Sequence, residues 1–147
     1  MKSLKLNTAL IFIIGLLVPA YLSCGGDDSP DEPTAQELAF EILAGQWTLS
    51  NGGSILLDGR DVSGNYPGFA LSFTDGSYQT TNAGELFNAT GTWTWVGDSD
   101  SMISVDDGKQ LIIQTLSANQ LSFSFQLTGS GGDAAGIAGS YVVTLFK

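Results

Sequence analysis

The sequence predicts an all-β domain in which eight or nine antiparallel strands follow a short N-terminal helix. From Gln46 onward, apolar residues recur at every second position or in short blocks, which is typical of strands. No segment between these runs has the length of a helix, so sequential strands are expected to pair as antiparallel neighbours. A meander of this many strands either packs as two sheets or closes on itself. Dipeptides that favour tight hairpins separate several runs: Asn51-Gly52, Asp58-Gly59, Asp75-Gly76 and Asp107-Gly108.

Residues 1–23 have the pattern of an export signal. Lys2 and Lys5 precede an apolar run from Leu10 to Leu22, which is too short to cross a bilayer of roughly 30 Å as a helix. Ser23 supplies the small residue expected before a cleavage site, and the single cysteine of the chain, Cys24, follows it. We therefore expect a signal peptide over residues 1–23.

The stretch Tyr21-Leu22-Ser23-Cys24 resembles the lipobox of bacterial lipoproteins. The resemblance implies that Cys24 is acylated and becomes the mature N-terminus, so that its lipid attaches the chain to a membrane. Each buried acyl methylene adds about 0.8 kcal/mol, and two or three chains make such attachment stable. The alternative is a free cysteine beside an ordinary signal.

Residues 24–33 are predicted to form a lipidated acidic linker. Residues 25–33 include four acids and two prolines and no apolar side chain, so this stretch cannot bury enough surface to fold. Gly25-Gly26-Asp27-Asp28 resembles the acidic export signal with which one group of Gram-negative bacteria sends lipoproteins to the outer leaflet. This resemblance implies attachment to the outer membrane with exposure at the cell surface. The alternative is a solvated tether without sorting content.

The negative charge and the scarcity of reactive side chains argue against nucleic acid binding, catalysis and metal binding. Fifteen acidic residues against five basic ones give a net charge of −10, which repels nucleic acid phosphates. The chain has no histidine and one cysteine, so it lacks the commonest general base and the commonest metal ligands. We expect a monomer that is no enzyme and holds no cofactor or metal. Lys109, in a predicted turn beside acids, is expected to stay protonated and inert.

Four acids flank one predicted strand: Asp98, Asp100, Asp106 and Asp107. Oxygen clusters of this kind can hold calcium, but the spacing matches no EF-hand loop. We interpret these acids as solvated turn residues.

The folded part is expected to begin at Thr34 with a short helix. Thr34 and Glu37 have the spacing of a capping box, and Gly45 is a suitable left-handed stop. Leu38, Ile42 and Leu43 are predicted to form the buried stripe of this helix. Nine apolar runs supply the candidate strands: Trp47–Leu49, Ile55–Leu57, Phe69–Phe73, Tyr78–Thr81, Trp93–Trp95, Met102–Val105, Leu111–Ile113, Leu121–Leu127 and Tyr141–Leu145.

Gly45-Gln46-Trp47, placed between the helix and the first strand, is similar to the G-x-W of lipocalins. Residues 36–147, with repeated hairpins and a closing Tyr-Val-Val-Thr-Leu-Phe strand, resemble the lipocalin-like domains of many bacterial lipoproteins. The resemblance implies an up-and-down antiparallel β-barrel over residues 34–147, with one end closed by the helix. The chain has no arginine in its last strand to lie across Trp47, and Lys147 is the one cation there.

Aromatic side chains are the candidates for a ligand site. A barrel of this kind could hold a small apolar or neutral amphipathic ligand among Trp47, Phe73, Trp93, Trp95, Phe123, Phe125 and Tyr141. Without an inward arginine candidate, neutral ligands are expected to outcompete anionic ones. The Gly-rich residues 128–136 would be a lid over the site or merely a loop. Alternatively, the same aromatics fill the barrel, and the chain is a structural or interaction protein of the cell envelope.

Overall fold

The computed structural model describes residues 31–106, 108–128 and 137–147, and the folded unit spans Glu32–Lys147. The predictions for the signal peptide, for Cys24, for most of the linker, for Asp107 and for residues 129–136 lie outside the described residues. Within the described part, no helix is both long and apolar enough to cross a membrane. The elements in order are α1 (Ala35–Leu43), β1 (Gly45–Thr48), β2 (Ser54–Leu57), β3 (Arg60–Asp61), η1 (Ser63–Asn65), β4 (Ala70–Thr74), β5 (Ser77–Thr81), β6 (Thr90–Trp95), β7 (Met102–Val105), β8 (Lys109–Leu116), β9 (Gln120–Leu127) and β10 (Gly139–Phe146).

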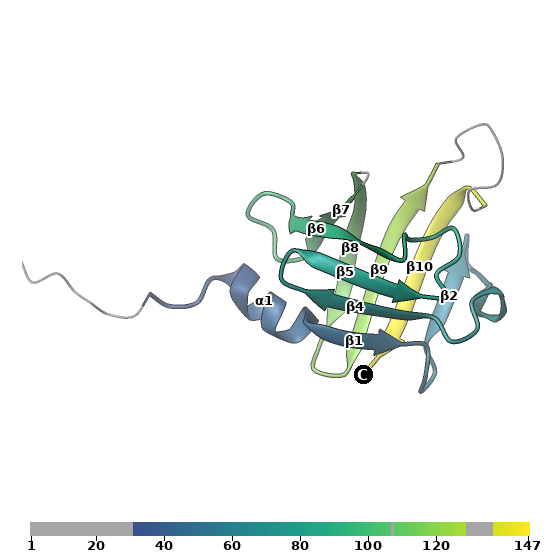
Figure 1. Cartoon of the computed structure of the whole chain (residues 1–147), viewed down its shortest axis with the longest axis horizontal. Helices are drawn as coiled ribbons and strands as arrows, with labels where there is room; N and C mark the ends of the chain where they lie inside the picture. Colours follow the sequence, from purple (N-terminus) through teal and green to yellow (C-terminus); the bar gives the residue numbers. More distant parts are fainter. Residues whose placement is uncertain (1–30, 107, 129–136) are drawn as a thin grey trace, which may run out of the picture. The chain divides into compact units, whose positions relative to one another are not determined.

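The strands form a closed antiparallel barrel with up-and-down topology, as predicted. The order β1-β4-β5-β6-β7-β8-β9-β10 returns to its start because β1 also pairs with β10, where Thr48 lies opposite Phe146. In Figure 1, β1, β4, β5 and β6 run across β8, β9 and β10, which lie behind them. Closure removes the free edges of these eight strands.

The β2–β3 hairpin lies outside the eight-stranded ring. β2 pairs with β10 at Val142↔Leu56, on the same edge of β10 that β1 occupies further along. The prediction that Asn51-Gly52 joins two neighbouring strands is therefore wrong: β1 and β2 follow one another along a shared partner. Asp58-Gly59 does form the predicted hairpin, between β2 and β3, with φ of 48° and 80°.

Helix α1 packs at one end of the barrel, and of the stripe that the sequence predicts, Leu38, Ile42 and Leu43, only Leu43 is buried. The capping box is present, since Thr34 N donates to Glu37 Oε2 (2.7 Å) and Glu37 N donates to Thr34 Oγ1 (3.2 Å). The buried side chains are Ala39 and Leu43, whereas Leu38 is 48% exposed and Ile42 is 37% exposed. Ala39 lies one turn before Leu43, so these two side chains share one face of the helix and pack together, whereas Leu38 and Ile42 lie to one side of that face.

Trp47 and Lys147 fasten this helix. Trp47 Nε1 donates a hydrogen bond to Leu43 O (2.8 Å), and the Trp47 side chain is fully buried. Lys147 Nζ donates to Ile42 O (2.7 Å) and Ala44 O (2.8 Å) and lies 4.2 Å from the centre of the Trp47 ring. Lys147 thus lies across Trp47, stabilising the negative end of the helix dipole and the ring face together.

Candidate functional site

The seven aromatic residues predicted to line a ligand cavity lie in or against the packed interior of the barrel. Trp47, Phe73, Phe123 and Tyr141 are at most 1% exposed, and Trp93 and Phe125 are also buried. Trp95 is half-buried and meets Trp93 edge-on, with 5.2 Å between the ring centres. These rings contact one another as core residues do. Of the seven, Phe125 alone also lines the main pocket of the described structure.

Residues 82–89, which connect β5 to β6, place Ala83, Leu86 and Phe87 in the interior of the barrel, while the other five residues of the connection are exposed. Leu86 and Phe87 are 0% and 5% exposed although they lie outside any strand. The Phe87 ring centre lies 5.3 Å from that of Phe125 and 6.2 Å from that of Phe123. This plug stands at the end opposite α1, which we call the mouth, and it occupies the volume that a deep cup would need.

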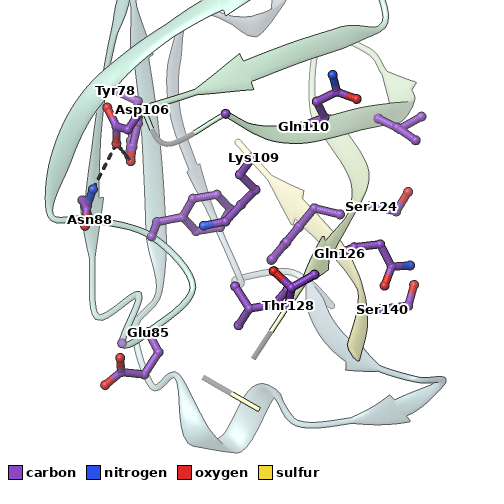
Figure 2. Close-up of a pocket in the computed structure, with 16 residues that line it drawn as sticks. Tyr78, Glu85, Asn88, Asp106, Lys109, Gln110, Ser124, Gln126, Thr128 and Ser140 are labelled. Carbon is purple, nitrogen blue, oxygen red and sulfur yellow. Dashed lines mark hydrogen bonds between the residues drawn. The ribbon is translucent and has the colours of Figure 1, made fainter. Parts of the chain in front are cut away.

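A pocket of about 880 Å³ lies at the mouth, outside the plug. Its wall combines ten polar side chains from β5, β8, β9, β10 and the connections with fewer apolar ones. In Figure 2, Ser124, Gln126 and Ser140 lie together on one side, Tyr78, Asp106 and Asn88 lie on the other, and Lys109 extends between them. The pocket therefore reaches from the rim of the barrel onto the outer face of β9 and β10.

Lys109 has a different environment from the one that the sequence suggests. It is the first residue of β8 and is half-buried. Its Nζ donates a hydrogen bond to Leu86 O (2.6 Å) and lies 4.9 Å and 5.6 Å from the ring centres of Phe87 and Phe125. The ammonium group therefore holds the plug in the mouth and places one positive charge at the pocket. This inward-facing cation was not predicted from the sequence, where Lys109 was placed in a solvated turn.

Asp106 anchors the opposite wall of the pocket and is more than a solvated turn acid. Its carboxylate accepts hydrogen bonds from Tyr78 Oη, from Asn88 Nδ2 (3.2 Å) and from Thr92 N (2.6 Å). These bonds, that of Tyr78 foremost, hold the pKa of the Asp106 carboxyl below its usual value. A Cβ on Gly91 would collide with an Asp106 carboxylate oxygen, so the carboxylate rests where only glycine leaves space.

The described acids do not assemble into a metal centre. No group of three or more His, Cys, Asp or Glu side chains suited to a metal ion occurs among residues 31–106, 108–128 and 137–147. Of Asp98, Asp100 and Asp106, which are the singled-out acids that the structure describes, Asp106 lines the pocket, beside Glu85. The described pocket wall thus carries two carboxylates and one ammonium group.

Several residues that line or support the pocket were not predicted from the sequence, although two of them have recognisable sequence patterns. Leu86-Phe87 is an apolar pair inside a connection, which is typical of a loop that folds into a core. Lys109 shares the parity of the inward residues Leu111 and Ile113 along β8. No comparable signal marks Gln126, because its role depends on which strands meet at the mouth. Comparisons of the chain with models of protein families, with curated proteins and with solved structures find no match.

Proposed function

We propose that this chain is a lipid-anchored protein of the outer membrane whose barrel binds a small neutral amphipathic ligand at its mouth. The pocket at the mouth carries the proposal. Its volume of about 880 Å³ falls in the range of roughly 300–1,000 Å³ that small-molecule sites occupy. Hydroxyl and amide groups on its wall can orient a ligand, while Phe87, Ile112, Phe125 and Leu127 provide apolar contact.

The packed interior argues for a ligand held at the mouth, not along the barrel axis. An acyl chain would need to displace Leu86 and Phe87, which are buried and held by Lys109. The opposing charges of Glu85, Asp106 and Lys109 give the described wall no excess of positive charge to attract an anion. A neutral ligand with both polar and apolar surface therefore fits this pocket best.

The binding test compares two glutamines that face outward on different strands. Residues 25–147 labelled with ¹⁵N are titrated with neutral and anionic amphiphiles, and the side-chain amide signals are followed. We expect saturable shifts for Gln126, which lines the pocket, and none for Gln79 of β5. Gln126→Ala should weaken binding several-fold, and Gln79→Ala should not. Shifts spread over both glutamines, or none at micromolar ligand, would count against the proposal.

The lipid anchor is tested at Cys24, where the resemblance to the lipobox supports attachment. In cells supplied with labelled fatty acid, the parent chain should incorporate label and lose residues 1–23. Cys24→Ala should leave an unlabelled precursor of all 147 residues. A processed but unlabelled parent chain would refute lipidation, and fractionation into the inner membrane would refute the location.

A second function, that of a structural or interaction protein of the envelope, is favoured by the filled interior of the barrel. In that case the mouth and its connections would contact a macromolecule and the pocket would hold no small ligand. The two functions differ in the titration: an interaction protein leaves the Gln126 signal unchanged with every amphiphile.

A further inference from the structure

The exposed connection between β1 and β2 contains the dipeptide Asn51-Gly52. Both residues have positive φ, 62° for Asn51 and 93° for Gly52. A Cβ on Gly52 would meet no heavy atom within 4 Å, so the space around this residue is open. The next residue, Gly53, is packed instead, because a Cβ there would lie 2.7 Å from Leu49 Cα and 2.8 Å from Thr144 O. The Asn51-Gly52 peptide therefore has room to change its conformation, while Gly53 has none.

Both reactive groups of this dipeptide lack a hydrogen-bond partner among the residues that the structure describes. Nothing there holds the side-chain amide of Asn51, and the backbone N–H of Gly52 donates to no acceptor. The Asn51 side chain can therefore rotate freely between rotamers. Gly52 has no Cβ that would hinder its nitrogen from approaching that side chain. An intramolecular reaction between two such groups gains from their proximity.

Two other asparagines in the described part have their side chains held. Asn82 Nδ2 donates a hydrogen bond to Pro67 O (2.8 Å), and Asn88 Nδ2 donates to Asp106 Oδ2 (3.2 Å). Both are exposed, as Asn51 is, and Asn82 has a similar φ of 52°. Exposure and backbone conformation thus do not distinguish Asn51 from Asn82, whereas the bound side chain does.

The remaining two described asparagines are followed by backbone amides that are already engaged. Tyr66 N, which follows Asn65, donates to a backbone carbonyl at 3.0 Å. Gln120 N, which follows Asn119, donates to a serine hydroxyl at 3.1 Å. Asn51 is therefore the described asparagine at which both the side chain and the following amide are available.

We infer that Asn51 is a site of spontaneous deamidation. The Gly52 nitrogen, after losing its proton to a base, attacks Asn51 Cγ, and the bond from Cγ to Nδ2 breaks with release of ammonia. Water then opens the resulting cyclic imide at either carbonyl and leaves aspartate or isoaspartate at position 51. The reaction transfers no electrons and consumes only water, and each product adds one negative charge. The inference does not depend on the proposed function.

The modification should change the connection and leave the barrel intact. β1 and β2 are each paired along β10, at Thr48↔Phe146 and at Ser54↔Thr144, so the ladder holds both strands in place. Isoaspartate lengthens the backbone, and the open space around Gly52 can accommodate this. Residues 49–53 contribute nothing to the pocket at the mouth. We therefore expect the deamidated chain to stay folded and to bind in that pocket as the parent does.

The test follows the full chain, kept folded at mildly alkaline pH, by peptide mapping with mass spectrometry. The change from amide to acid is measured at each asparagine, and isoaspartate is detected with an isoaspartyl methyltransferase. We expect Asn51 to react at least tenfold faster than Asn82, the matched control, and its rate to rise with pH because the attacking nitrogen must lose a proton. Asn51→Gln should remove the reaction, since its longer side chain closes a ring less readily.

The variant Ala89→Gly separates the effect of structure from that of sequence. It creates a second Asn-Gly pair at an exposed position, but Asp106 still holds the Asn88 side chain. In the folded variant Asn88 should react at least tenfold more slowly than Asn51, and in the urea-unfolded chain the two rates should become similar. The inference is overturned if Asn51 stays intact or reacts no faster than Asn82. It is overturned equally if Asn88 reacts as fast as Asn51 in folded Ala89→Gly.

Discussion

Replacing Trp47 with alanine should be among the most damaging changes to this fold. The side chain is fully buried at the junction of α1, β1 and the last residue of the chain. Truncating a core tryptophan to alanine costs about 3–5 kcal/mol because burial is lost and a cavity remains. Trp47→Ala also leaves Leu43 O without the indole donor and removes the ring beneath Lys147. We therefore expect a loss near the upper part of that range.

Urea unfolding followed by far-ultraviolet circular dichroism measures this loss without relying on tryptophan emission. With a slope of about 1.5 kcal/mol per molar urea, a loss of 3–5 kcal/mol lowers the midpoint by about 2–3 M. Trp47→Phe keeps an aromatic ring but not the donor, so it should cost about 1–3 kcal/mol from the unpaired carbonyl.

The control is Trp95→Ala, because Trp95 is half-buried and its ring rests on Trp93 from one side. It should shift the midpoint clearly less than Trp47→Ala does. If Trp47→Ala unfolds at the midpoint of the parent or of Trp95→Ala, then Trp47 does not fasten the helix to the barrel, and the account of the closed end is wrong.

The other predictions concern single contacts. Lys147→Met should cost about 1–2 kcal/mol in thermal or urea unfolding, because the helix end and the indole ring lose their cation; no loss would refute this contact. The lowered pKa of Asp106 implies stability that is present above about pH 4, near the pKa of an unfolded aspartate, and is lost as pH falls through the folded pKa. The difference in melting temperature between parent and Asp106→Asn should therefore shrink from pH 6 to pH 3, and a constant difference would contradict it. Gly91→Ala should lower the melting temperature by displacing that carboxylate, whereas Gly64→Ala, with open space around it, should not.

The strands and their inward faces could be predicted from local pattern. Alternation along Leu121–Leu127 and Tyr141–Leu145 identified β9 and β10, because a strand with one buried face must repeat every two residues. The cap of α1 was predictable for the same local reason, since Thr34 and Glu37 satisfy each other within one turn. The buried face of α1 was predictable only in part: Leu43 is buried as expected, but the small Ala39 is buried with it, while Leu38 and Ile42 stay exposed although they have helical spacing.

The sequence by itself determined that the chain forms strands with one apolar side and joins several of them by hairpins. It also showed Lys147 to be the one cation at the end of the last predicted strand, but its contact with Trp47 comes from the tertiary structure. Only the tertiary structure decided that β1 and β2 share one edge of β10 and that Leu86 and Phe87 fill the mouth. It also placed the Lys109 ammonium group against the Phe87 ring, at the wall of the pocket. These features arise between segments far apart in the chain, and a pattern of period two specifies which side of a strand is buried but not which strand it meets.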